Sequence, residues 1–211
     1  MEKLVFKTIK SRSETSQVIQ KIERYSGVRL PDDYVNRSKV VGVFLHNQLA
    51  ACYMLVTQPN LRSLMFVPDQ IKKSNSLFSN DDYEMMEVNG LWIGPSLKKP
   101  AMQIRVWMHL VKDIFSARKK FVLLMRDKRT KSMEKFMDMT NPISLYEGSP
   151  NLMTGEKTHN NIKVVYTTRW NVVLNVPKLL IELWNRNRRS EAFAKQRDLV
   201  RALKQTEANY T

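Results

Sequence analysis

The most informative pattern of apolar and polar residues runs from Tyr83 to Asp127. Glu84–Ile93 is largely apolar, which predicts a buried strand. Pro95–Pro100 interrupts it, and apolar residues then recur at helical spacing over about four turns. These residues are Ile104, Trp107, Met108, Val111, Ile114 and Phe115. A second short apolar run, Phe121–Met125, follows, so the whole segment predicts strand, loop, helix and strand.

The N-terminal third predicts a strand, a capped helix and a hairpin. Leu4–Ile9 is a short apolar run, and Ser11 followed by Glu14 has the spacing of a capping box. A helical face follows, and Gly27 is a plausible stop for this helix. Further along, two apolar runs flank His46-Asn47-Gln48, which predicts a β-hairpin. The runs are Val40–Leu45 and Leu49–Thr57.

Weaker patterns lie on both sides of the central segment. Leu64–Val67 predicts a short strand, and Lys72–Ser79 predicts a loop. Beyond residue 127 the pattern predicts a short helix, then strands, with a polar loop among them. The helix covers Thr130–Met139, the strands Ile143–Tyr146, Ile162–Thr167 and Trp170–Leu174, and the loop Gly148–Asn161.

The C-terminal part predicts a helical extension. Asn175 is a good N-cap and Pro177 suits a first helical turn, and a helical pattern continues to about Gln205. The wholly polar stretch Asn185–Arg189 divides its apolar positions into two clusters. We therefore expect one domain over residues 1–174 and a basic helical extension over residues 175–211.

Charge narrows the range of partners. The 211 residues carry a formal net charge of +15, which indicates an anionic partner such as nucleic acid, a phosphorylated ligand, an acidic protein or an anionic membrane. Residues 98–135 hold twelve Lys or Arg against three Asp or Glu, a net of +9. A solvated basic face is the alternative interpretation.

Other features exclude several classes of protein. No run of 18 apolar residues is present, so we expect no membrane span, and the N-terminus lacks the long apolar segment of a signal peptide. The single cysteine, Cys52, excludes an internal disulfide, fits a reducing compartment and predicts a cytoplasmic protein. Cys52 lies in a predicted strand, which favours a core residue over a nucleophile. The three histidines show no metal-ligand spacing, so no metal is expected.

The order of the predicted elements over residues 4–174 resembles the GCN5-related N-acetyltransferase (GNAT) fold. The predicted fold class is therefore α/β, with a mixed central sheet flanked by helices. Glu84–Ile93 resembles the family's fourth strand, Pro95–Gln103 its pyrophosphate loop and Ile104–Arg118 the helix behind that loop. The resemblance implies acetyl-CoA or another acyl-CoA as the cofactor, and a helix N-terminus that follows a strand suits such an anion.

The loop departs from the family pattern of Gln/Arg-x-x-Gly-x-Gly/Ala. Its four candidate cofactor-binding residues are Lys98, Lys99, Ala101 and Gln103. Lys98 keeps the basic first position, but Ala101 and Gln103 replace small residues that let amides approach a pyrophosphate. Pro100 removes one amide donor altogether. These departures predict weakened acyl-CoA binding.

Acyl transfer to an amine needs a base and a proton donor near the leaving thiolate. Where many members of the family place a carboxylate base, this chain has Glu87, with Glu84 as the backup. The alternative for Glu87 is a polar position on a half-exposed strand. Tyr146 is a conceivable acid or a packed aromatic residue, and His109 is expected to face solvent.

Three functions remain open. The first is a GNAT-like protein with weakened or lost acyl-CoA binding that acts as a binding or regulatory protein through a basic surface. The second is an acyl-CoA-dependent N-acyltransferase, and the third is a nucleic-acid-binding protein. The expected partner is an acidic protein or nucleic acid. The candidate partner-binding residues are Arg186, Arg188, Arg189, Lys195, Arg197 and Arg201.

Overall fold

The computed structural model describes residues 3–127, 137–149 and 161–186, together with residues 188, 189, 192, 193 and 196. The chain divides into two units, Met1–Asn175 and Val176–Thr211. The first unit is built on a seven-stranded mixed sheet in the order β1-β2-β3-β4-β5-β7-β6. The strands are β1 Leu4–Thr8, β2 Ser38–Leu45, β3 Gln48–Val56, β4 Met85–Ile93, β5 Phe121–Asp127, β6 Ile143–Gly148 and β7 Ile162–Thr168.

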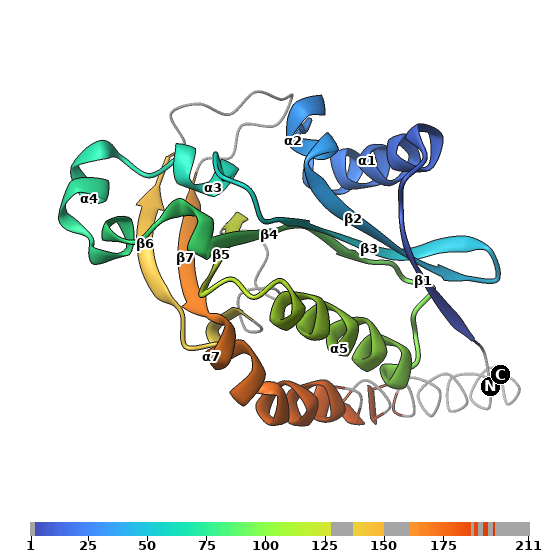
Figure 1. Ribbon diagram of the computed structural model, residues 1–211. Helices are drawn as coiled ribbons and strands as arrows, with labels where there is room; N and C mark the ends of the chain where they lie inside the picture. The colour runs from blue at the N-terminus through green and yellow to red at the C-terminus, as the bar shows by residue number, and fades with distance from the viewer. Residues whose placement is uncertain are drawn as a thin grey trace, which may run out of the picture. The chain divides into compact units, whose positions relative to one another are not determined.

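Helices cover both faces of this sheet (Figure 1). Those on one face are α1 Arg12–Ser26 and α2 Asp32–Asn36, and those on the other are α5 Pro100–Ser116 and α7 Arg169–Leu174. Short elements join β3 to β4, namely α3 Arg62–Met65, α4 Asp69–Ser74, η1 Ser76–Ser79 and η2 Asp82–Glu84. The two apolar layers that result enclose β3 and β4, which are buried along most of their length.

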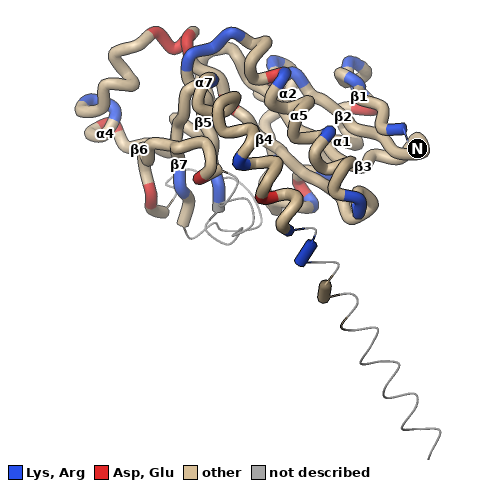
Figure 2. Tube along the Cα trace, turned by 90° about the horizontal axis from the view of Figure 1, so that it is seen from below, with Lys and Arg blue, Asp and Glu red and all other residues tan. Residues whose placement is uncertain are grey.

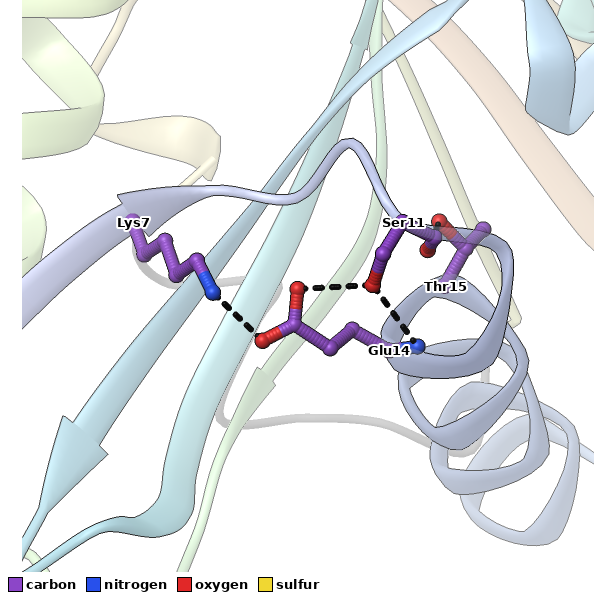
Figure 3. A network of polar contacts seen from close by, with 4 residues as sticks. All are labelled: Lys7, Ser11, Glu14 and Thr15. Atoms are coloured by element: carbon purple, nitrogen blue, oxygen red, sulfur yellow. Dashed lines mark hydrogen bonds and ion pairs between the residues drawn. The ribbon is translucent and has the colours of Figure 1, made fainter.

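The predicted cap of α1 is confirmed and also ties the helix to β1. The Glu14 amide donates to Ser11 Oγ at 3.3 Å, and the Ser11 hydroxyl donates to Glu14 Oε2 at 2.9 Å. Lys7 of β1 pairs with the same carboxylate, and Figure 3 shows these contacts together. Gly27 ends the helix at φ 72°, a left-handed conformation that glycine adopts without strain.

Two short apolar runs form helices where strands were expected. Leu64–Val67 lies at the end of α3 and beyond it, and Trp170–Leu174 forms most of α7. In α7 the Thr168 side chain caps the first turn by accepting from the Asn171 amide, so a local hydrogen bond starts the helix. The predicted loop at Lys72–Ser79 is also wrong, because α4 and η1 occupy it.

Helix α5 is confirmed, but its buried face is rotated from the predicted one. Trp107, Val111 and Ile114 are buried, whereas Met108 and Phe115 are exposed by 38% and 40%. The buried stripe also includes Asp113, whose carboxylate accepts from Tyr53 at 2.8 Å and pairs with Lys39 at 2.8 Å. A charged residue thus lies on the inner face because its charge is paired there.

The helix that begins the second unit covers residues 176–186. Within this unit Arg189 pairs with Glu182 at 3.1 Å, and Arg188 lies over the Trp184 ring at 5.1 Å. Among the described helices of the chain, none is long and apolar enough to cross a membrane. The predicted helix at 130–139 and the predicted loop at 148–161 fall largely outside the described residues.

Candidate functional site

The central feature is the point at which β4 and β5 separate. These parallel strands pair from Met85 with Phe121 to Val88 with Leu124, and the register ends there although both strands continue. On its other side, β4 carries an extra residue against β3 between the Asn89 and Trp92 pairs. Gly90 lies in this bulge at φ 59°. The bulge turns β4 away from β5 and leaves the β5-facing backbone edge of residues 89–93 without strand partners among the residues described.

Glu87 lies one residue before the separation. Its neighbours are Leu123 on β5 and Val56 on β3, and its side chain is fully buried. The expectation of a half-exposed polar position is therefore wrong. Its side chain lies on the face that α1 and α2 cover, because Asn89, two residues further along β4, is hydrogen-bonded to Tyr34 of α2 at 3.0 Å.

Both carboxylate oxygens of Glu87 accept hydrogen bonds. The Ser63 amide of α3 donates to Oε2 at 3.2 Å, and the Asn89 side chain donates to Oε1 at 3.1 Å. Burial raises the pKa of Glu87 above its usual range, while the Ser63 and Tyr34 hydrogen bonds and the positive charge of Arg62 oppose that rise. A buried carboxyl with a raised pKa binds a proton more readily than an exposed one, which suits a general base.

Arg62, at the start of α3, supplies a buried positive charge to this group. Its side chain is 8% exposed, and its guanidinium lies over the Phe66 ring at 5.4 Å. Burial lowers the pKa of Arg62, and the charges of Glu87 and Tyr34 oppose that change. Burial also raises the pKa of Tyr34, with a further contribution from the charge of Glu87.

The loop after β4 contains the four predicted cofactor-binding residues. Lys98, Lys99 and Ala101 are exposed. Gln103 is the long residue that replaces a small one of the family pattern. Its side chain folds back and donates to the Leu97 carbonyl at 2.8 Å, which braces the loop.

The first turn of α5 offers few amides to an anion. Pro100 is its first residue and has no N–H. The amides of Met102 and Gln103 both donate to the Lys99 carbonyl, at 2.9 and 3.4 Å. Ala101 therefore provides the one available amide of this turn, where an unmodified helix N-terminus would offer several.

Other predicted residues lie away from Glu87. Glu84 belongs to η2 and pairs with Lys120 at 3.6 Å. Tyr146 is on β6, which β7 and β5 separate from β4, and its hydroxyl donates to Ser149. Cys52 is buried in the core, and burial raises the pKa of its thiol to about 12.

His109 belongs to a separate cluster, so the expectation that it faces solvent is wrong. Its Nδ1 is 2.7 Å from the Tyr53 hydroxyl, and its ring stacks on Phe6 at 4.2 Å. Burial lowers the pKa of His109. No group of three His, Cys, Asp or Glu side chains that could hold a metal ion occurs in the described part of the chain.

Of the predicted partner-binding residues, Arg186, Arg188 and Arg189 are exposed, and Lys195, Arg197 and Arg201 lie outside the described residues. Figure 2 shows that lysines and arginines are spread over several elements of the first unit. The prediction missed Arg62, Ser63, Asn89 and Tyr34, which surround Glu87. Asn89 is two residues from Glu87 on the same strand, so the alternation of strand side chains could have indicated it. Arg62, Ser63 and Tyr34 come from two helices far from β4 in the sequence, and no spacing rule links them to Glu87.

The chain matches no protein-family model and no curated protein. Its structure is similar to FeeM, an N-acyl amino acid synthase from uncultured soil microbes, with a TM-score of 0.59 at 5% identity over 81% of this chain and 93% of that one. It is also similar to Arabidopsis thaliana NAA60 in complex with a bisubstrate analogue, with a TM-score of 0.55 at 8% identity over 79% of this chain and 99% of that one. A third similar structure is the Escherichia coli ribosomal-protein-S18-alanine N-acetyltransferase, with a TM-score of 0.53 at 6% identity over 79% of this chain and 94% of that one. The chain has the GNAT-like fold, as its element order predicted.

Proposed function

We propose that this chain is an N-acyltransferase that moves an acyl group from a thioester to an amine. The observation that carries the proposal is the position of Glu87, a buried carboxyl with a raised pKa, one residue before β4 leaves β5. Similar structures from three sources support it, since two are named as an N-acyl synthase and an N-acetyltransferase and one was solved with a bisubstrate analogue.

The chemistry assigns Glu87 the role of base. The acceptor amine arrives as an ammonium ion and gives one proton to the Glu87 carboxylate. The nitrogen lone pair then attacks the thioester carbonyl, the carbon–nitrogen bond forms and the carbon–sulfur bond breaks. The thiolate takes the second proton of the nitrogen and leaves as a thiol, and Glu87 returns its proton to water.

The residues present fit an acyl-CoA in part. A bound acyl-CoA supplies the activated acyl group. The unpaired edge of β4 over residues 89–93 offers backbone groups to its pantetheine arm, and Lys98 and Lys99 lie exposed beside the helix that would face its phosphates. Ala101 alone gives an amide in the first turn of α5. In this proposal the acyl-CoA is thus held mainly by the unpaired edge of β4 and only weakly by the loop before α5.

The test is turnover of acetyl-CoA with a panel of primary amines, followed as free thiol. Glu87→Gln is expected to lower turnover at least a hundredfold, as the loss of a general base does. Glu84→Gln is the matched control, because Glu84 is partly exposed on η2, and it should retain the native rate. Equal rates for Glu87→Gln and the native protein would remove Glu87 from the reaction.

A second candidate function is a GNAT-like binding or regulatory protein that has lost its donor. The single available amide in the first turn of α5 favours it. Such a protein would engage an acidic protein or a nucleic acid through its basic residues, among them Arg186, Arg188 and Arg189. Calorimetry with acetyl-CoA separates the two functions: a micromolar dissociation constant supports the enzyme, and no heat with any acyl-CoA supports the binding protein.

A further inference from the structure

Arg62 is a largely buried residue whose guanidinium has no hydrogen-bond partner among the residues that the structure describes. The side chain is 8% exposed, yet its five N–H donors make no hydrogen bond and no ion pair with any residue that the structure describes. Its contact is the Phe66 ring, and Glu87 acts on it only as a nearby charge. Buried guanidinium groups are ordinarily paired with an anion, because desolvation without compensation is costly.

Glu87 does not supply that pairing. Its two oxygens are already occupied by the Ser63 amide and by the Asn89 side chain. Ser63 follows Arg62 directly in α3, so a single peptide link holds the guanidinium near the carboxylate without joining the two. The site therefore holds a guanidinium and a carboxyl group close enough for their charges to interact, without a bond between them.

We propose that Arg62 binds the carboxylate of the acyl acceptor, so that the acceptor is a small amino acid type of molecule, with its amine at Glu87. This inference rests on the proposed function. The guanidinium fork matches the two oxygens of a carboxylate, and such charged pairs are the stronger class of hydrogen bond. A zwitterion complements both charges of the site, whereas a phosphate would bring a second negative charge beside Glu87.

The first experiment compares acceptors that differ only in this group. A panel of common L-amino acids is assayed beside the matching amino acid carboxamides, with acetyl-CoA as donor. The native protein is expected to favour the acids by at least tenfold in kcat/KM, as a charged hydrogen bond commonly gives. Arg62→Met should abolish this preference, Arg62→Lys should keep part of it, and Arg105→Met, which removes an exposed charge on α5, should leave it unchanged.

The second experiment measures binding without any donor. Calorimetry with the same acids and carboxamides should show heat for the acids alone, and Arg62→Lys should weaken that binding while the fold persists. Acid binding without acyl transfer would uphold the carboxylate site and overturn the proposed function. Acylation of both panels at equal rates would uphold the function and overturn the role of Arg62. If the protein neither binds the acids nor acylates them, both the carboxylate site and the proposed function are overturned.

Discussion

At the scale of single residues, the site depends on Glu87 being buried and still accepting hydrogen bonds. Burial disfavours the charged carboxylate, and the hydrogen bonds from Ser63 and Tyr34 and the charge of Arg62 favour it. Because burial is the larger effect, the pKa of Glu87 is higher in the folded chain than in the unfolded one. The folded state therefore binds this proton more tightly, and the resulting stabilisation is lost as the pH rises through the folded pKa.

We predict that Glu87→Gln changes the pH dependence of stability. The glutamine cannot ionise, so the native protein should lose free energy of unfolding relative to the variant as the pH is raised above 4.5, the ordinary value of the carboxyl. Urea denaturation at several pH values measures this difference. Parallel curves for the two proteins would show that the pKa of Glu87 is not raised by folding.

At the scale of elements, the bulge in β4 shapes the site. Gly90 has a φ of 59°, and a Cβ on it would lie 2.6 Å from Ile22 Cδ1 of α1. Both the left-handed backbone and the close packing of α1 thus require glycine here. The pairing of β4 with β5 ends beside this bulge, so the conformation of one residue links the packing of α1 to the unpaired edge of β4 that follows Glu87.

Gly90→Ala is accordingly expected to destabilise the fold by about 1–3 kcal/mol, the usual cost of a strained left-handed residue. It should also weaken any acetyl-CoA binding, because the unpaired edge of β4 would shift. Chemical denaturation and calorimetry measure the two effects. Gly148→Ala separates crowding from backbone strain, because its Cβ would also meet a side chain, 2.5 Å from the Tyr146 hydroxyl, while this glycine does not have a positive φ. A native midpoint and native affinity in Gly90→Ala would contradict this account of the bulge.

For the loop before α5 we predict a substitution that tightens acetyl-CoA binding instead of weakening it. Pro100→Ala restores an amide at the first position of the helix, and one added hydrogen bond to a pyrophosphate should tighten acetyl-CoA binding about tenfold. Pro95→Ala, in the exposed part of the same loop outside the helix, should have no such effect. An unchanged affinity in Pro100→Ala would show that this helix end does not meet the phosphates of the donor.

The sequence predicted elements better than it predicted the site. The strand–loop–helix–strand segment, the hairpin and the capped helix follow from periodicity and from local residues such as Ser11 and Gly27, and local patterns report local structure. Four-residue runs such as Leu64–Val67 fail, since a short apolar run suits a helix or a strand equally well. Arg62 meets Glu87 only through the tertiary fold, so no pattern along the chain could connect them.

At the scale of the whole molecule, the two units carry different features. The unit Met1–Asn175 contains the sheet, with the unpaired edge of β4 and Glu87. The unit Val176–Thr211 contains a helix with exposed Arg186, Arg188 and Arg189. Within the helix of the second unit, Leu179 and Leu183 are buried while Ile181 and Trp184 are more than half exposed. This helix thus has an apolar stripe in its first part, and the arginines follow that stripe.

We therefore expect a truncation after Asn185 to separate folding from charge-driven association. It keeps Leu179 and Leu183 and removes the three exposed arginines, so the free energy of unfolding should change by less than about 1 kcal/mol. Binding to a 20-nucleotide single-stranded DNA or to polyglutamate should fall in the truncated chain. In the full chain that binding should fade above physiological salt, where the screening length is about 8 Å.

The full-length chain with Arg186, Arg188 and Arg189 all changed to Gln is the control, since it removes these three charges and leaves the rest of the chain in place. If it loses binding as the truncated chain does, the arginines are the binding groups. If the truncated chain unfolds, the residues after Asn185 contribute to the core and the extension is not a separate binding element. If the truncated chain and the triple variant both bind the two probes as the full chain does, the association comes from the basic residues of the first unit. Exposed examples near the proposed donor site are Lys98, Lys99 and Arg105.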